Sequence, residues 1–295
     1  MKVISPSDRK AAASAGLAVS PPGRSFLRWA GSKRQLLPAL RAHWQPSYGR
    51  YIEPFAGSAA LFFELRPSRA VLGDTNHELI LTYIQVKENL QPVLDALSRM
   101  RKSKALYLTL RSQDPSRLPP AKRAARFIYL NRFSFNGLYR TNRSGAFNVP
   151  YGGERCGDLP STGLLTQCSL HLQRARVLCA DFETTLKGAH EGDFVYIDPP
   201  FSIAGRRVFK EYSAATFGDD QVDRLRHLLL RLESRGAAFL LSYADSSEGE
   251  LLARGFHAEA HSVRRNIAGF AGQRAPSTEL LIFNRKPLLP EASHA

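Results

Sequence analysis

Short apolar runs recur along the chain, and most of them have the length of a β-strand. They are rich in branched and aromatic side chains and end at an acid or a turn, which is typical of buried strands. The runs lie at 50–53, 70–74, 176–181, 194–197 and 238–243, and segments 256–263 and 279–284 resemble a closing strand pair.

Helical patterns stand between these runs, at 59–65, 76–90 and 219–234, the last with leucines at 225, 228, 229 and 232. Asn76 is suited to cap the second helix and Pro92 to stop it. Because strand and helix alternate from the start, the sequence predicts an α/β sheet.

The character changes over 88–175, where basic residues, prolines and polar turns dominate. We therefore predict one Rossmann-like sheet domain, formed by 26–87 and 176–285, that is interrupted by an inserted domain at 88–175. Residues 1–25 and 286–295 have the composition of flexible tails.

Charge narrows the class of partner. The 295 residues carry a formal net charge of +15 with an ordinary hydrophobic content of 43%. A polyanion is the expected partner, with nucleic acid the commonest and an anionic membrane surface the alternative. No apolar run has the length of a spanning helix, so we expect no membrane segment.

Neither cysteines nor histidines predict a metal site. Cys156, Cys168 and Cys179 form no C-x-x-C pair, and a reducing cytoplasm is the expected location. His257 and His261 lack the H-E-x-x-H pattern of a zinc helix and are interpreted as surface residues.

Asp198-Pro199-Pro200-Phe201 directly follows the run at 194–197. Two prolines make a rigid loop that presents one carboxylate beside one flat ring. The carboxylate and a backbone carbonyl can accept both hydrogens of an exocyclic adenine amine, which localises the nitrogen lone pair, while the ring stacks on the base. The alternative is a plain strand end with a proline turn. The acid and the aromatic favour the catalytic interpretation.

A second candidate site follows the first strand. Phe55-Ala56-Gly57-Ser58-Ala59 lies where α/β sheets bind ligands, and Gly57 permits close approach to the backbone. Asp74, at the end of the next strand, could accept ribose hydroxyls. The dinucleotide fingerprint G-x-G-x-x-G is absent. A structural turn is the alternative, but together with Asp198 these residues indicate a nucleoside cofactor. Trp29 and Lys33 could supply a ring and an ammonium group to a cofactor carboxylate, or simply begin a helix.

Six motifs in order along 26–285 resemble the Dam-type DNA adenine methyltransferases, the alpha-group or D12 class. They are Arg28-Trp29-Ala30-Gly31-Ser32-Lys33, Glu53-Pro54-Phe55-Ala56-Gly57-Ser58, Gly73-Asp74-Thr75-Asn76, 131–140, 145–152 and Asp198-Pro199-Pro200-Phe201.

The resemblance implies S-adenosylmethionine-dependent methylation of the N6 amine of adenine in duplex DNA, with the base flipped out of the helix. It implies a methyltransferase sheet domain with a mainly helical target-recognition insertion. The catalytic residues would be Asp198, Pro199, Pro200 and Phe201. The cofactor would contact Trp29, Lys33, Phe55, Gly57, Asp74, Asp181, Phe182 and Asp198.

Target recognition would fall to the insertion, with GATC as the expected site. The DNA-contacting residues would be Arg28, Asn136, Leu138, Arg140, Asn142, Arg143, Asn148, Pro150 and Tyr151. Arg28 and Arg140 could each grip a guanine, although phosphate contact is the alternative for any arginine. We expect a monomer in solution, with two copies able to occupy a palindromic site.

Three positions depart from the family pattern. Phe201 replaces the usual tyrosine, Ala59 replaces the second glycine of the cofactor turn, and Gly153-Glu154 stands where basic or aromatic residues are usual. An RNA adenine methyltransferase and a catalytically inactive DNA-binding relative remain the alternative functions.

Overall fold

Seven strands form one sheet in the part of the chain that the structure, a computed structural model, describes: residues 23–29, 31, 33–142, 145–153, 156–200, 218–264 and 276–287. The strand order is β3-β2-β1-β4-β5-β7-β6. The strands are β1 (Arg50–Glu53), β2 (Ala70–Asp74), β3 (Ala175–Cys179), β4 (Asp193–Ile197), β5 (Ala238–Ala244), β6 (His257–Arg264) and β7 (Pro276–Phe283). All seven lie where the sequence predicted them.

The strands from β1 to β5 pair in parallel, and β7 runs antiparallel to both β5 and β6. From β1 the chain moves outward through β2 to β3, then returns to the other side of β1 with β4. This reversal between β1 and β4 leaves a crevice outside their carboxyl ends, which is where open α/β sheets bind ligands.

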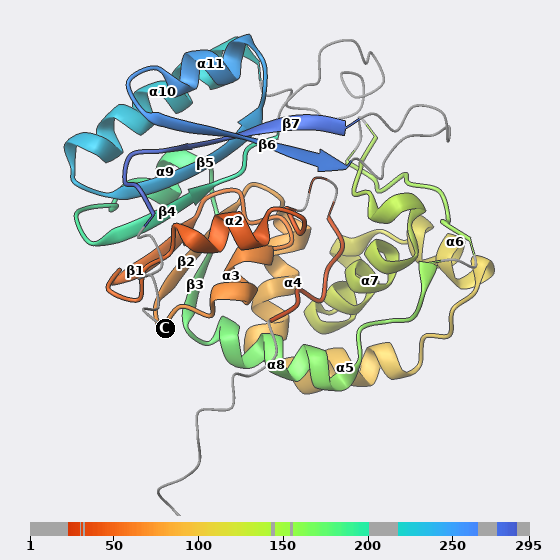
Figure 1. Cartoon of the computed structure of the whole chain (residues 1–295). Coiled ribbons are helices and arrows are strands. Elements are labelled where there is room, and N and C mark those ends of the chain that lie inside the picture. The colour runs from red at the N-terminus through yellow and green to blue at the C-terminus, as the bar shows by residue number, and fades with distance from the viewer. Residues whose placement is uncertain are drawn as a thin grey trace, which may run out of the picture.

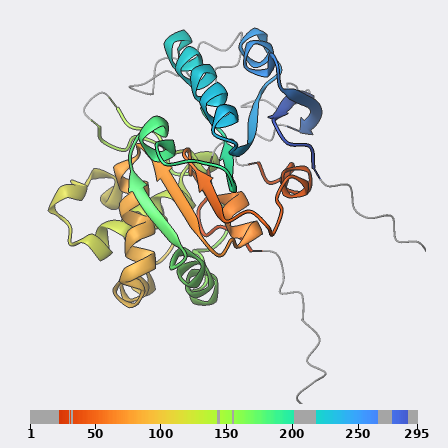
Figure 2. The same cartoon turned by 90° about the vertical axis from the view of Figure 1, so that its left-hand side faces the viewer.

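Side chains alternate between the two faces of the sheet, as the pleat requires. Tyr51 and Tyr196 pack on one face, while Ile52 and Ile197 pack on the other. The first face is covered by α2 (Leu37–Ala42), α3 (Ala60–Leu65), α4 (His77–Glu88) and α8 (Thr162–Leu172). The second is covered by α9 (Phe182–Leu186), α10 (Asp219–Ser234) and α11 (Ser247–Ala253). Figures 1 and 2 show the resulting three layers.

The expected cap of α4 is present, because the side chain of Asn76 accepts a hydrogen bond from the Leu79 amide. The expected stop was wrong. Helix α4 ends at Glu88, and α5 (Leu90–Ser98) begins at once with Pro92 in its first turn. Proline is tolerated there because amides of the first turn have no partner within the helix.

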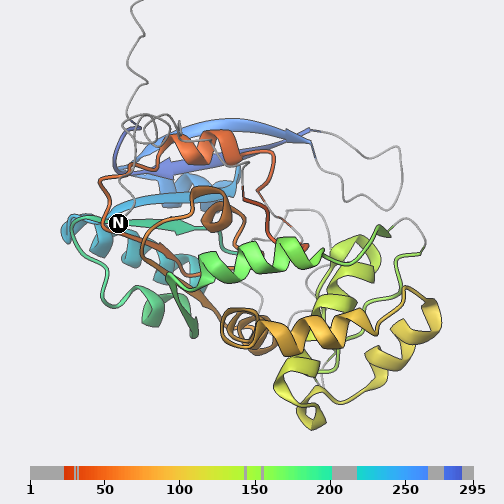
Figure 3. The same ribbon diagram turned by 90° about the horizontal axis from the view of Figure 1, so that it is seen from below.

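The inserted segment carries its own small core. Helices α5, α6 (Lys104–Ser112) and α7 (Pro120–Phe133) lie to one side of the sheet, as Figure 3 shows, with short 3₁₀ turns at Pro115–Arg117 and Phe135–Gly137. Tyr107, Tyr129 and Phe133 are fully buried in this core. The insertion is mainly helical, as predicted. Among the described residues, no helix has both the length and the apolar character needed to cross a bilayer.

Candidate active site at the carboxyl ends of the strands

Asp198 and the turn at 55–59 meet at the crevice between β1 and β4. Asp198 directly follows β4, and the turn directly follows β1. These two strands are hydrogen-bonded neighbours, with Ile52 in register with Val195. The sheet therefore brings together two motifs that are far apart in the sequence.

Asp198 is held by a buried lysine. Lys33 Nζ lies 2.7 Å from Asp198 Oδ1 and 3.6 Å from Glu279 Oε2, and its side chain is only 7% exposed. Burial lowers the pKa of Lys33, but the carboxylates of Asp198 and Glu279 outweigh it and leave the pKa above its ordinary value. The lysine is therefore a permanent cation beside the acid.

A serine on the neighbouring strand holds the same oxygen. Ser242 Oγ donates to Asp198 Oδ1 at 3.0 Å, and Tyr196 Oη lies 3.2 Å from Ser242 Oγ. Ser242 is fully buried in β5. Our sequence reasoning missed it, although a hydroxyl inside the apolar run at 238–243 was a usable signal, since a buried hydroxyl needs a partner.

The glycine turn has the geometry of a close-approach site. Gly57 has φ +47°, and a Cβ placed there would lie 2.9 Å from Trp29 Cδ1. Its amide donates to Asp74 Oδ2 at 3.0 Å, and its carbonyl accepts from Tyr83 Oη at 2.7 Å. Ala59 adopts φ +49°, a conformation that is strained for any residue with a Cβ.

Asp74 supports the turn with both of its carboxylate oxygens. Oδ1 accepts from the Asn76 amide at 2.9 Å while Oδ2 accepts from Gly57. Burial raises the pKa of Asp74, and these amide donors partly offset the rise. A carboxylate has about four acceptor positions, so Asp74 can still accept a hydroxyl of a ligand while it holds the turn.

Phe55 and Phe182 form a stacked pair, with ring centroids 5.4 Å apart and planes at 26°. Phe182 is buried. Asp181 is committed to the fold: it caps α9 through the Thr184 amide and lies 3.0 Å from Arg224, whose guanidinium covers the Phe182 ring at 4.9 Å. The structure thus places the predicted acid-aromatic pair next to the glycine turn.

A buried carboxyl that we did not single out lies close to the two acids of the site. Glu53 is 3% exposed and accepts a hydrogen bond from Tyr51 Oη at 2.9 Å. Burial raises its pKa well above the usual range, and the nearby charges of Asp198 and Asp74 add to the rise. The surroundings of Glu53 therefore favour its neutral form.

Pro199 is buried and Pro200 is exposed, so the rigid loop leaves the sheet at Pro200. The fourth residue of the motif, Phe201, lies outside the described residues, as does Arg143 of the recognition set.

Two contacts join this site to the insertion. The Trp29 ring stacks on Tyr139, with centroids 5.9 Å apart and planes at 15°. The Asn131 side chain accepts from the Arg28 amide at 2.9 Å and donates to the Arg28 carbonyl at 2.6 Å. The Arg28 side chain is half-buried against Gly137.

Three of the predicted DNA-contacting residues, Arg140, Asn142 and Asn148, lie on a short hairpin whose two sides meet at the bridge between Thr141 and Phe147. Arg140 Nε donates to Asn148 Oδ1 at 2.9 Å, so the two side chains form one unit. The exposed Asn142 closes the turn, because its Oδ1 accepts from the Ala146 amide.

The remaining members flank this hairpin. Asn136 is exposed with φ +54°, Leu138 is half-buried, Pro150 is exposed and Tyr151 pairs with Ser134. Beside them, Phe135 is 47% exposed. Our sequence reasoning did not include it, and an exposed aromatic side chain on a basic surface is a candidate for stacking on bases.

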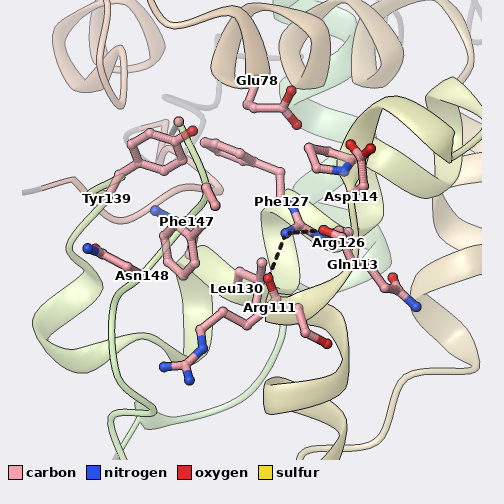
Figure 4. Close-up of a pocket in the computed structure, with 15 residues that line it drawn as sticks. Glu78, Arg111, Gln113, Asp114, Arg126, Phe127, Leu130, Tyr139, Phe147 and Asn148 are labelled. Atoms are coloured by element: carbon pink, nitrogen blue, oxygen red, sulfur yellow. Dashed lines mark hydrogen bonds between the residues drawn. The ribbon is translucent and has the colours of Figure 1, made fainter. Parts of the chain in front are cut away.

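A cavity of about 770 Å³ lies behind the hairpin and is separate from the strand-end site. Figure 4 shows Tyr139, Phe147 and Asn148 facing Phe127 and Arg126 across it, with Glu78 and Asp114 at its rim. Arg126 is committed to the fold, since it donates to the carbonyls of Leu110, Arg111 and Gln113 near the end of α6. Across the described ranges, no group of three or more His, Cys, Asp or Glu residues is placed to hold a metal ion.

Comparison with known proteins agrees with this geometry. The family of D12 class N6 adenine-specific DNA methyltransferases matches residues 29–267. The Type II methyltransferase M1.LlaDCHI of Lactococcus lactis subsp. cremoris is 36% identical over 270 residues, covering 88% of this chain and 95% of the relative.

Two further relatives have different names. The Type II methyltransferase M.MjaIII of Methanocaldococcus jannaschii is 32% identical, covering 88% of this chain and 99% of the relative. The DNA adenine methylase of Escherichia coli strain K12 is 31% identical, covering 88% and 94%.

The fold and the strand-end site define a methyltransferase of the mixed α/β class. The chain belongs to the D12 class N6 adenine-specific DNA methyltransferase family. It is a DNA adenine methyltransferase, and the expected enzyme class is confirmed.

Proposed function

We propose that the enzyme transfers a methyl group from S-adenosylmethionine to the N6 amine of adenine within GATC in duplex DNA, on a base flipped out of the helix. The observation that carries the proposal is the fixed carboxylate of Asp198 in the crevice between β1 and β4, beside the glycine turn. The Escherichia coli relative is a DNA adenine methylase and the Lactococcus relative a Type II methyltransferase, so the proposed target sequence rests on the recognition segments of this chain.

Asp198 is the residue that we assign to the amine. Lys33 and Ser242 both hold Oδ1, and within the described part of the chain Oδ2 has no hydrogen-bond partner. Oδ2 is therefore the oxygen to accept one amine hydrogen, while the backbone carbonyl of the proline loop accepts the other. Both bonds draw the nitrogen toward a tetrahedral shape and make its lone pair available for in-line attack.

The residues around the glycine turn fit a nucleoside cofactor that carries an amino acid group. A residue with a Cβ at position 57 would crowd Trp29, so glycine keeps the turn open to a ligand. Asp74 would hold the ribose hydroxyls, the stacked pair of Phe55 and Phe182 would lie on one side of the adenine ring, and Trp29 and Lys33 would face the amino acid group. When bound, S-adenosylmethionine supplies an activated methyl group, so the protein has only to align and polarise the amine.

Flipping the adenine requires a surface that replaces the lost stacking. Phe135 is exposed beside Asn136 at the edge of the insertion. We assign it to stacking on the neighbouring bases that lose their contact with the adenine when the adenine is flipped out. Phe201, by its place in the motif, would stack on the flipped base itself.

Base reading is assigned to Arg140 because its guanidinium is braced. The bond from Nε to Asn148 Oδ1 fixes the plane of the guanidinium group, and a guanidinium group in a fixed plane suits a bidentate contact to the O6 and N7 atoms of a guanine. An arginine that only meets phosphates has no need of such a brace.

The test is methyl transfer from radiolabelled S-adenosylmethionine to duplexes that carry GATC, a permuted tetranucleotide with the same composition, or the RNA version of the same sequence. We expect label only in the GATC duplex, and none with Asp198→Ala. Asp245, which follows β5 at the same edge and is exposed, provides the matched control Asp245→Ala, which should retain activity. Label in the permuted duplex would refute GATC, and label in RNA would support the RNA alternative.

Arg140→Ala separates base reading from phosphate contact. If Arg140 reads a guanine, the variant loses about 1–3 kcal/mol of binding free energy on GATC and accepts other bases at one position. If it meets only phosphate, binding weakens equally on all duplexes and the salt slope falls by about one. Asn148→Ala should show the same relaxed specificity in a weaker form, because it removes only the brace.

A further inference from the structure

A row of arginines lies along the amino edge of the sheet, opposite the strand-end site. Arg50 begins β1, and Arg69 and Arg174 immediately precede β2 and β3. The Tyr51 amide bonds the Arg69 carbonyl and the Ala70 amide bonds the Arg174 carbonyl, each at 3.0 Å. Neighbouring strands are about 4.8 Å apart, so the backbone positions of Arg50, Arg69 and Arg174 lie within about 10 Å of each other.

The row borders an open hollow of about 550 Å³. Arg176 and Lys87 also line it, and Glu88 is its one acidic residue. We call the three arginines at 69, 174 and 176, with this hollow, the amino-edge surface.

The charge of the amino-edge surface is largely uncompensated. Arg50 pairs with Asp193 and Lys87 donates to the Ala175 carbonyl, so these two cations are used by the fold. Arg69, Arg174 and Arg176 are exposed, and within the described ranges none of their guanidinium groups forms a hydrogen bond or ion pair. Three exposed like charges side by side repel each other, which favours a polyanionic partner there.

We propose that the amino-edge surface binds the phosphate backbone of a second segment of duplex DNA while the strand-end site holds the first. The strands between the two edges are about 15 Å long and both faces are covered by helices. A straight duplex across the carboxyl ends therefore cannot reach the amino ends. The second segment belongs either to another molecule or to a distant part of the same one.

Duplex DNA fits this surface better than a single strand or a membrane. Arginine forks match phosphate oxygens, and duplex DNA presents one charge per about 1.7 Å of its axis. Single-strand sites add aromatic side chains on which bases stack. The apolar residues that line the hollow are Ala70, Val71, Ile84, Ala175 and Val177, which offer no ring to a base and no large side chain to a bilayer.

The test is a bridging assay with the full chain. The protein is saturated with a short immobilised duplex that contains the methylation target, and a second fluorescent duplex without the target is then added. The triple variant Arg69→Gln/Arg174→Gln/Arg176→Gln is compared with Arg235→Gln/Arg254→Gln/Arg285→Gln, which removes the same charge from exposed arginines elsewhere.

We expect wild type and control to capture the second duplex and the triple variant to bind it at least tenfold more weakly. The salt slope for the second duplex should fall by about 0.9 for each lost phosphate contact. Single-turnover methylation of the short duplex should be equal in all three proteins, so this result stands apart from the proposed target and mechanism. The single variant Arg176→Glu repeats the comparison with a smaller change to the fold.

Equal capture by the triple variant would overturn the proposal. So would release of the second duplex by single-stranded RNA, or by anionic vesicles, at lower phosphate concentrations than by unlabelled duplex.

Discussion

Lys33 Nζ lies 2.7 Å from Asp198 Oδ1, so a cation from the start of the described chain neutralises the acid at the end of β4. Glu279 approaches the same ammonium at 3.6 Å. Removing the cation leaves two carboxylates close together with little water, which is more costly than losing the ion pair alone.

We predict that Lys33→Met lowers the free energy of unfolding by about 3–5 kcal/mol. Glu279→Gln added to Lys33→Met should restore part of this loss, because it removes one of the two stranded charges. Urea denaturation of both single variants and the double variant gives the coupling energy. Strictly additive losses would show that Lys33 and Glu279 do not interact.

Ser242→Ala should slow methyl transfer about ten- to a hundredfold, because a hydrogen bond to a charged group contributes about 1.5–3 kcal/mol. The cofactor dissociation constant should stay the same, since Ser242 touches Asp198 and no residue of the glycine turn. Single-turnover rates and calorimetric titration separate the two effects. Weaker cofactor binding with an unchanged rate of methyl transfer would show that Ser242 supports the cofactor site and not the position of Asp198.

Asp74→Asn and Asp74→Ala should separate the ligand role of this acid from its role in the turn. Both variants lose the charge, but only asparagine retains an oxygen for the Gly57 amide. We expect Asp74→Asn to weaken cofactor binding about tenfold with little change in stability, and Asp74→Ala to weaken binding and lower stability together. Calorimetry and thermal unfolding measure both. Full cofactor affinity in Asp74→Asn would remove Asp74 from the cofactor site.

Glu53→Gln should stabilise the enzyme more as the pH rises. The folded pKa of Glu53 lies well above the usual value of 4.5, so the carboxyl favours the folded state below about pH 4.5 and loses this contribution as the pH rises toward its folded pKa. Glutamine keeps an acceptor for Tyr51 and has no proton to lose. Urea denaturation from about pH 4.5 to pH 8 should show a widening advantage for the variant. A constant difference would mean that folding does not raise the pKa of Glu53.

Local patterns were enough to predict the sheet. Each strand is a short apolar run. Two of the three predicted helices begin within one residue of their predicted starts, directly after a polar or turn residue. The boundary at Pro92 failed because a proline that ends one helix and a proline in the first turn of the next have the same local signature. Helix α8 was not predicted, since its burial depends largely on α4, which lies far away in the sequence.

The candidate site divides in the same way. Asp198 and Gly57 could be predicted because each has unusual neighbours in the sequence. Glu279 has no such neighbours, and the polar Ser242 inside an apolar run signals only that it needs a partner. Both gain their positions in the site from the pairing of β5 with β4 and β7. Which hydroxyl reaches which carboxylate depends on register across the sheet, and one sequence does not specify that register.

The antiparallel β7 also has a consequence for how the enzyme is made. Its direction puts Glu279 in register with Ala244, at the carboxyl end of β5 and within reach of Lys33. A ribosome that has completed β4 and β5 has made Lys33, Asp198 and Ser242, but it has not yet made β7, the strand that joins β6 to the sheet. Assembly of the charged cluster must therefore wait until β7 has emerged, and a nascent chain that stops before β7 would still lack a finished centre.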